Sequence, residues 1–199
     1  MGKVISSASM SLDGFIANHD HTVGHLFDWY EVGDQPVSTA SPDITFTLTE
    51  TSAAYWRSWI GRVGALVVGR ELFDLTDGWG GRHPIGTPVV VITHEAPRGW
   101  SYPGSEDFHF VTDGIGAGVA LAQQLAGDKN VSVTAGTIAR QCLEAGLLDE
   151  VAVDLVPLVM GVGRPYFGEL TDGRPALLGD PTTVIQSDRV THLVFPVVR

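Results

Sequence analysis

Short apolar runs alternate with segments of helical periodicity along most of this chain. Six apolar runs predict strands at residues 4–10, 65–68, 89–93, 108–111, 131–134 and 151–158. The helical periodicity predicts helices at residues 49–62, 71–75, 119–125 and 137–145. The run at 89–93 is apolar almost throughout, which is typical of a strand covered on both faces. This alternation favours a parallel sheet with helices on its two faces.

The last part of the chain has a different pattern. Residues 182–187 and 191–197 predict two strands joined around Asp188 and Arg189, and these form an antiparallel hairpin. The fold class that we predict is therefore an α/β three-layer sandwich, with a mostly parallel central sheet and a C-terminal antiparallel hairpin. At 199 residues, the chain is expected to form one domain over residues 1–199.

Three local features refine this prediction. Residues 19–41 are rich in polar residues, glycine and proline, and are expected to form a long irregular loop. The helix at 49–62 is expected to begin at a cap formed by Thr49 or Thr51. Residues 114–118 read G-I-G-A-G, and the third glycine comes one position too early for the dinucleotide fingerprint G-x-G-x-x-G, so we interpret this segment as a loop that leads into a helix.

Composition and charge narrow the classes of function. The chain has 12 Lys and Arg against 23 Asp and Glu, a formal net charge of −11, which argues against nucleic acid and anionic membranes as partners. The sequence has neither a signal-peptide pattern nor a membrane-spanning apolar run, and a cytoplasmic protein is expected. The single cysteine, Cys142, excludes an internal disulfide and is expected as a buried thiol. His19, His21 and His25 match no zinc-ligand spacing, and no metal is predicted.

Two segments run from an apolar strand through a glycine into the start of a helix. They are residues 67–73, with Gly69, and residues 131–138, with Gly136. Such a junction leaves backbone N–H groups unpaired at the positive end of the helix dipole, and glycine lets a phosphate approach them closely. Two of these junctions in one acidic chain indicate a diphosphate held between two helix starts. A dinucleotide is therefore the first cofactor to test.

These junctions belong to a longer series of motifs. The series comprises S-M-S-L-D-G-F-I-A at residues 9–17, V-G-R-E-L-F at 68–73, V-V-I-T at 90–93, A-G at 135–136, G-L-L-D-E at 146–150, P-L-V-M-G at 157–161, and Gly163. Through these motifs the chain resembles the dihydrofolate-reductase-like family, specifically the reductase domain of riboflavin biosynthesis and its free-standing single-domain relatives. The resemblance covers nearly the whole chain, and it implies a dihydrofolate-reductase-like fold with NADPH as the cofactor.

The resemblance implies cofactor contacts for nine residues. They are Gly69, Arg70 and Glu71 beside the diphosphate or the adenosine phosphate, Thr93 and His94 near the adenosine ribose and its 2′-phosphate, and Ala135, Gly136, Thr137 and Ile138 along the diphosphate and nicotinamide. Arg70 has the strongest physical case, because a guanidinium binds phosphate bidentately. The alternative for Arg70 is a solvent-exposed arginine at a helix start. The family usually carries Gly-Gly where this chain has Ala135-Gly136, and the extra methyl group narrows the allowed backbone.

The candidates for substrate binding are aromatic. The riboflavin enzymes typically carry a basic residue after the Asp-Gly pair, whereas this chain has Phe15, which cannot bind a phosphate. A flat, apolar heteroaromatic ligand suits Phe15, Trp29 and Trp79 better. For Trp29, the alternative is a hydrophobic plug that anchors its loop.

Two carboxyl groups are candidates for delivering a proton to the hydride acceptor. Asp13 follows the first predicted strand, where the substrate pocket of the family lies. Alternatively, Asp13 caps its own turn, because Asp-Gly is a turn former. Glu50 is the second candidate, at the start of a helix, where an acidic residue also complements the helix dipole.

These residues favour an NADPH-dependent reductase that transfers a hydride to a small heterocyclic substrate, pterin-like or pyrimidine-like. Two alternatives stay open. One is the riboflavin-pathway reductase of 5-amino-6-ribosylaminopyrimidine phosphate, with Arg82 or Arg164 binding the ribose phosphate. The other is a non-catalytic nucleotide- or small-molecule-binding protein on the same fold. A homodimer is expected, because relatives with this fold often pair across a two-fold axis.

Overall fold

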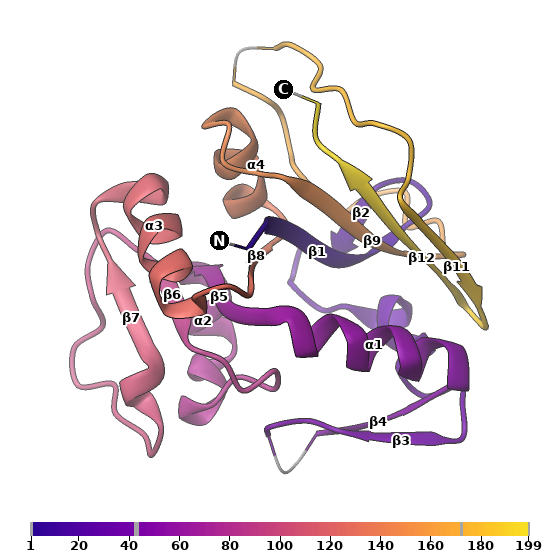
Figure 1. Ribbon diagram of the computed structural model, residues 1–199, viewed down its shortest axis with the longest axis horizontal. Helices are drawn as coiled ribbons and strands as arrows, with labels where there is room; N and C mark the ends of the chain where they lie inside the picture. The colour runs from indigo at the N-terminus through magenta and orange to yellow at the C-terminus, as the bar shows by residue number, and fades with distance from the viewer. Residues whose placement is uncertain (1, 42–43, 172, 199) are drawn as a thin grey trace.

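The structure, a computed structural model, describes residues 2–41, 44–171 and 173–198. Its centre is an eight-stranded sheet in the order β11-β12-β9-β1-β8-β5-β6-β7 (Figure 1). The strands of this sheet are β1 (Val4–Ser11), β5 (Val63–Gly69), β6 (Val89–Ile92), β7 (Phe108–Val111), β8 (Asn130–Thr134), β9 (Glu150–Val156), β11 (Thr183–Ser187) and β12 (Val190–Pro196). Neighbouring strands from β9 to β7 are parallel, whereas β12 runs antiparallel to both β9 and β11. The predicted α/β fold with a C-terminal antiparallel pair is confirmed.

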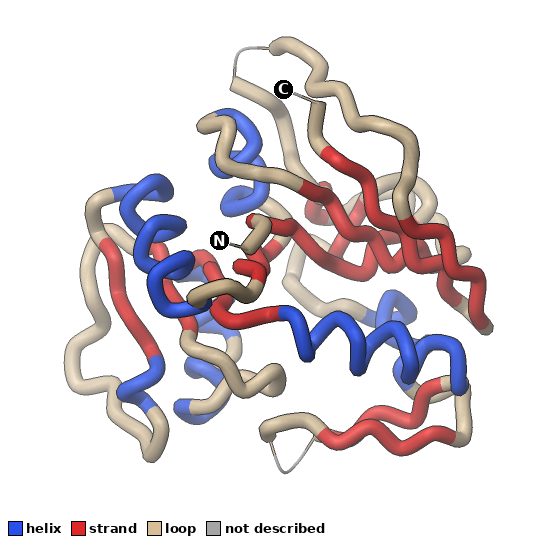
Figure 2. The backbone as a smooth tube through the Cα atoms, in the orientation of Figure 1, coloured by secondary structure: helices blue, strands red, loops and turns tan. Residues whose placement is uncertain are grey.

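Helices cover both faces of this sheet (Figure 2). The helices are α1 (Glu50–Arg62) and α2 (Arg70–Leu75) on one face, and α3 (Gly114–Ala126) and α4 (Thr137–Glu144) on the other. Because alternate residues of a strand point to opposite faces, β5 sends Val67 toward α3 and α4 and Val68 toward α1 and α2. Both side chains are fully buried, as expected for a strand between two helical layers. Within the described ranges, no helix is both long enough and apolar enough to cross a membrane.

Helix α1 begins at the predicted cap. The hydroxyl oxygen of Thr49 accepts a hydrogen bond from the backbone N–H of Ser52 at 3.2 Å, whereas Thr51 is exposed inside the first turn. A serine or threonine in this position satisfies one of the N–H groups that a helix start leaves unpaired. The cap fixes the start of the helix that carries Tyr55, Trp56 and Trp59.

The smaller elements include one segment that was predicted wrongly. They are β2 (Phe15–Ala17), β3 (Gln35–Ser38), β4 (Thr45–Leu48), β10 (Arg164–Pro165) and the 3-10 helices η1 (Gly24–Tyr30), η2 (Asp77–Gly81) and η3 (Ser105–Asp107).

Residues 19–41 were expected to be irregular, but they contain η1 and β3. Their order depends on distant contacts, such as the stacking of Tyr30 on Phe46 with ring centroids 4.3 Å apart. Local periodicity does not reveal such contacts.

The start of α3 was also predicted wrongly. The helix begins at Gly114 rather than at residue 119, so the glycine-rich segment lies inside it. A Cβ atom on Gly118 would come within 2.1 Å of Ile92 Cδ1. This glycine therefore lets α3 pack closely on β6, and the segment is part of the helix and not a loop.

Cys142 lies on α4 with a fully buried side chain, as predicted. Burial raises the pKa of its thiol to about 12, so the group stays protonated at neutral pH. The residue belongs to the apolar cluster between α4 and the sheet, where it acts as a small hydrophobic side chain.

Candidate functional site

A continuous cleft of about 1320 Å³ opens at the carboxyl ends of the parallel strands. In open α/β sheets, ligands bind in the crevice at this end of the strands. We call the part along the β5–α2 and β8–α4 junctions the outer half, and the part between α1, η1 and the sheet the inner half. The outer half is lined by Gly69, Arg70, Glu71, Thr93, His94, Ala135, Gly136, Thr137, Ile138, Arg140 and Arg164. The inner half is lined by Ser7, Ser9, Tyr30, Tyr55, Trp56, Trp59, His83 and Asp154.

The structure brings all nine residues expected at the cofactor together in the outer half. Gly69 is the N-cap of α2 and Gly136 is the N-cap of α4. A glycine has no side chain that could accept a hydrogen bond from the N–H groups of the first helical turn. The φ angle of Gly136 is +83°, a backbone conformation that favours glycine. A Cβ atom on Gly136 would find Ile16 Cδ1 as its nearest neighbour, 3.8 Å away. The glycine thus leaves an open approach to the backbone at the start of α4.

Arg70 is held in place by neighbouring groups. Its Nε donates to Asp74 Oδ1 at 2.7 Å, and its Nη1 donates to the carbonyl oxygen of Glu95 at 2.7 Å and to Thr93 Oγ1 at 3.3 Å. The contacts join the start of α2 to the end of β6. They fix the guanidinium at the mouth of the outer half, where the Arg70 side chain is 36% exposed, and its role at a phosphate stays a prediction.

A cluster of ionisable groups joins three elements around the outer half. Arg164 of β10 pairs with Glu71 of α2, and its Nη1 lies 3.1 Å from His21 Nε2. His21 Nε2 also lies 3.4 Å from Glu71 Oε1. Of the two arginines considered for a substrate phosphate, Arg164 lines the cleft, and Arg82 is not among its lining residues. We call the three linked residues the Arg164 clasp.

The two predicted proton donors lie outside the cleft lining. Asp13 accepts hydrogen bonds from Ser11 Oγ at 2.7 Å and from the backbone N–H groups of Met160 and Gly161 at 3.1 and 2.7 Å. These bonds, above all the one from Ser11, lower the pKa of Asp13 to about 2, whereas a proton donor needs a raised pKa. Glu50 is an exposed residue in the first turn of α1. The geometry favours a structural role for Asp13, which joins its turn to the segment at Met160 and Gly161, and the helix-dipole alternative for Glu50.

The three aromatic residues predicted at the substrate also lie outside the lining. Trp29 is 1% exposed and donates from Nε1 to Ser9 Oγ at 3.0 Å, which favours the alternative of a plug that anchors its segment. Trp79 packs edge-on against His83, with ring centroids 4.4 Å apart. Phe15, on β2, packs against Gly163. Trp29 and Trp79 therefore contact residues that line the cleft instead of lining it themselves.

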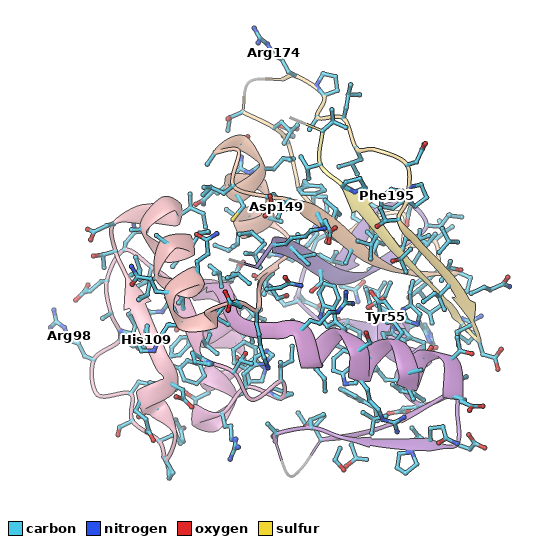
Figure 3. The ribbon with its side chains drawn as sticks, in the orientation of Figure 1. Tyr55, Arg98, His109, Asp149, Arg174 and Phe195 are labelled. Carbon is cyan, nitrogen blue, oxygen red and sulfur yellow. The ribbon has the colours of Figure 1, made fainter. Side chains whose placement is uncertain are left out.

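Aromatic side chains from α1 and η1 form the walls of the inner half. Tyr55, Trp56 and Trp59 come from α1, and Tyr30 comes from η1. Figure 3 shows Tyr55 projecting from α1 toward the sheet, where its ring stacks on His192 with centroids 4.1 Å apart. The indole N–H of Trp56 is buried and has no hydrogen-bond partner within the described part of the chain. These walls suit a flat ring that carries a hydrogen-bond acceptor.

His83 presents a neutral imidazole to the inner half. The backbone N–H of Ile85 donates to His83 Nδ1 at 3.1 Å, so the ring proton of the neutral tautomer lies on Nε2. Burial lowers the pKa of His83 to about 4, which keeps the ring uncharged at neutral pH. His83 is therefore available as a neutral hydrogen-bond donor to a bound ligand.

Asp154 is the carboxylate of the inner half. Its side chain is 16% exposed, and its Oδ1 lies 2.6 Å from Nδ1 of the fully buried His192. The two residues face each other across the β9–β12 pair. His192 Nε2 lies 3.0 Å from the hydroxyl oxygen of the buried Ser52. Sequence reasoning missed this chain of three residues, although an aspartate inside the apolar run V-A-V-D-L-V is a signal, because charged residues are seldom buried unless paired.

Solved structures of other proteins share this fold. A protein from Shewanella sp. PV-4, described as a riboflavin biosynthesis protein, is 21% identical, with 99% of each chain covered and a TM-score of 0.71. A deaminase and 5-amino-6-(5-phosphoribosylamino)uracil reductase from Thermotoga maritima is 15% identical, with 99% of this chain and 57% of that chain covered and a TM-score of 0.60. Dihydrofolate reductase from Enterococcus faecalis, complexed with NADP(H) and RAB-propyl, is 12% identical, with 100% and 98% covered and a TM-score of 0.55.

These similarities show that the chain has the dihydrofolate-reductase-like fold, as the sequence motifs predicted. The similarity is one of structure, because no protein-family model matches the chain and no curated protein matches it in sequence.

Proposed function

We propose that this protein is an NADPH-dependent reductase of a small heterocyclic substrate, pterin-like or pyrimidine-like. The observation that carries the proposal is that one cleft joins the nine cofactor-type residues of the outer half to the aromatic inner half with its carboxylate. A hydride donor in one half and a flat acceptor in the other would then lie next to each other, as hydride transfer requires. The solved structures support the proposal, because two of them are named as reductases and one of these is complexed with NADP(H).

The residues of the outer half fit a dinucleotide. Backbone N–H groups at the starts of α2 and α4 suit a diphosphate, and Gly136 keeps the approach to α4 open. Arg70 and the hydroxyl of Thr93 suit a ribose phosphate. When bound, NADPH would supply the hydride; the protein would orient the acceptor and deliver a proton to it.

A calorimetric titration with NADPH and, separately, with NADH tests the cofactor. We expect micromolar binding that favours NADPH and falls at least tenfold in Arg70→Ala, a loss of about 1.4 kcal/mol. Arg57→Ala is the matched control, because it removes the same charge from an exposed position on α1 outside the cleft lining. The absence of binding by either nucleotide would contradict the proposal. Binding of NADPH without turnover of any heterocycle would favour the non-catalytic binding protein.

The Arg164 clasp favours a second candidate, the reductase of a ribosylaminopyrimidine phosphate. The guanidinium of Arg164 lies in the cleft lining and would bind a phosphate that displaces Glu71 and His21. Turnover of this phosphate ester in preference to a pterin, lost in Arg164→Ala, would establish the second candidate. Equal turnover of the pterin by Arg164→Ala would support the first.

A further inference from the structure

Ser52, His192 and Asp154 form a chain of hydrogen bonds that ends in the inner half of the cleft. Ser52 and His192 are buried, and Asp154 alone lines the cleft. The distances are 3.0 Å between Ser52 Oγ and His192 Nε2 and 2.6 Å between His192 Nδ1 and Asp154 Oδ1. The imidazole lies between the ring of Tyr55, stacked on it, and the edge of Trp29. Packing therefore holds this imidazole in one orientation.

The order of the three residues excludes a hydrolytic triad. In a Ser-His-Asp triad, the serine faces the substrate and the carboxylate is behind the histidine. Here the serine is 1% exposed and the carboxylate faces the cleft, so Ser52 cannot attack a ligand. The group placed to contact a ligand is Asp154, and His192 acts only through it.

The chain of hydrogen bonds fits two protonation states of His192. In the neutral state, Nδ1–H donates to Asp154 and Nε2 accepts from the hydroxyl of Ser52. In the charged state, Nε2–H donates to the same hydroxyl, because a serine oxygen is both a donor and an acceptor. His192 can therefore gain or lose a proton without leaving a buried group unpaired, which would otherwise be costly.

The surroundings of Asp154 define the ligand that it suits. Within the described part of the chain, His192 is the only basic group within ion-pair distance of Asp154. The arginines that line the cleft are Arg70, Arg140 and Arg164, all in the outer half. The phenols of Tyr30 and Tyr55 face the carboxylate, and both have a raised pKa, first from burial and then from the charge of Asp154. Tyr166 is affected by the same charge from the opposite face of the sheet, after the larger effect of burial.

We propose that Asp154 binds and protonates a ring nitrogen of the substrate, and that His192 is a positioning residue that stores the proton and returns it to Asp154. The proposal rests on the proposed reductase function. The ligand class is a planar ring that presents the nitrogen of a C=N bond, with an N–H group beside it, to Asp154 Oδ2, since Oδ1 is engaged by His192. An anionic group would be repelled from this half.

The proton and electron balance of the step is simple. When bound, a reduced nicotinamide would supply a hydride, with its electron pair, to the ring carbon of a C=N bond. The ring nitrogen accepts one proton from Asp154, and the imidazolium of His192 loses one proton to Asp154. The products are the C–H and N–H bonds, an oxidised nicotinamide, an ionised Asp154 and a neutral His192, which takes up its next proton from solvent.

Binding of benzamidine, a planar cation with N–H groups on one edge, tests the recognition step. Benzamide is the neutral probe of the same shape. We expect quenching of the fluorescence of Trp56 and Trp59 by benzamidine, with an affinity at least tenfold weaker in Asp154→Asn and unchanged in Glu169→Gln. Glu169 is the matched control, an exposed carboxylate at the rim of the same cleft. Benzamide has N–H groups but no charge, so its affinity should fall less in Asp154→Asn than that of benzamidine. Failure of the wild type to bind benzamidine, or equal binding by Asp154→Asn, would overturn the proposal.

The number of protons released when a ligand binds tests whether His192 stores a proton, because a purely structural role of His192 would not change this number. A cation that binds Asp154 should expel the proton that His192 stores, so the wild type should release up to one proton on binding. His192→Gln keeps a donor for Asp154 but cannot store a proton, and it should release almost none. Calorimetry in two buffers of different ionisation heat measures this number. Equal release by the wild type and His192→Gln would overturn the storage role.

NADPH titration of the same variants separates the two proposals. Asp154→Asn and His192→Gln should bind NADPH as tightly as the wild type, which also shows that both variants are folded. If NADPH binds but Asp154→Asn binds benzamidine as tightly as the wild type does, the reductase proposal stands and this inference fails. If benzamidine depends on Asp154 but no nucleotide binds, this recognition site stands and the reductase proposal fails.

Discussion

The two halves of the cleft are built in different ways. The outer half is formed largely by short segments of backbone where a strand turns through a glycine into a helix, at Gly69 and at Gly136. The inner half is formed by side chains from α1, η1, β1 and β9, together with His83, and these segments are far apart in the sequence. The first kind of site depends on what is absent from a position, namely a Cβ atom. The second kind depends on which side chains the topology brings together.

The comparison predicts that backbone changes will damage the outer half most. Gly136→Ala should cost about 1–3 kcal/mol of stability, because its φ of +83° strains any L-residue, and should weaken NADPH binding at least tenfold. Gly127→Ala is the matched control, with a φ of +61° at the end of α3, outside the cleft lining. It should cost similar stability and leave NADPH binding unchanged. Thermal unfolding and calorimetry measure both quantities, and equal NADPH binding by the two variants would break the comparison.

Replacing His83 in the inner half should change how the free energy of unfolding depends on pH. The pKa of His83 is about 4 in the folded state and about 6.5 in an unfolded chain, so the unfolded state binds the extra proton between these values. Stability is therefore complete above pH 6.5 and is lost as the pH falls toward 4, by at most about 3 kcal/mol from this group. Urea unfolding at pH 7, 5.5 and 4 should show a smaller loss in His83→Gln. The same loss in both proteins would argue against a neutral, buried His83.

The cap of α1 offers a smaller and more selective change. Thr49→Ala should reduce stability by about 1–2 kcal/mol and weaken ligands of the inner half, because α1 carries Tyr55 and Trp56. Thr51→Ala removes an exposed threonine two residues later that does not cap the helix, and should be close to neutral. NADPH binding should be the same in both variants. Equal unfolding temperatures for the two variants would show that the cap contributes little.

Ala135→Gly should give the smallest effect and a gain. It introduces the Gly-Gly pair of the reductases that the sequence motifs resemble, at the start of α4, and should tighten NADPH binding by a few-fold. The added backbone freedom of the unfolded chain should cost under about 1 kcal/mol of stability. Calorimetry resolves this change, and weaker NADPH binding in Ala135→Gly would mean that the methyl group contacts the cofactor favourably.

The difference between the halves also explains what sequence reasoning could find. Strands such as Phe108–Val111 and the cap at Thr49 follow from local patterns, and so do the two glycine junctions. Asp154 and His192 could not be paired in advance, because their contact depends on the register of β9 with β12. For the same reason, Asp13 and Glu50 were chosen by their place after a strand or at a helix start, although neither side chain lines the cleft.

The homodimer expected from the sequence stays a prediction. Light scattering of the purified protein would decide it, and a monomeric mass would contradict it.

The η2 turn places a tryptophan in a backbone conformation that favours glycine. Five consecutive residues from Asp77 to Gly81 have positive φ angles, and two of them, Asp77 and Trp79, are not glycine. A left-handed conformation costs about 1–2 kcal/mol for each such residue, and glycine at position 79 would avoid that cost. Trp79 instead packs against His83, which lines the cleft. Glycine at this position would relieve the backbone strain but would also remove the packing of Trp79 on His83 and on the apolar cluster around α1 and α2, so Trp79→Gly should lower ligand affinity without raising the unfolding temperature.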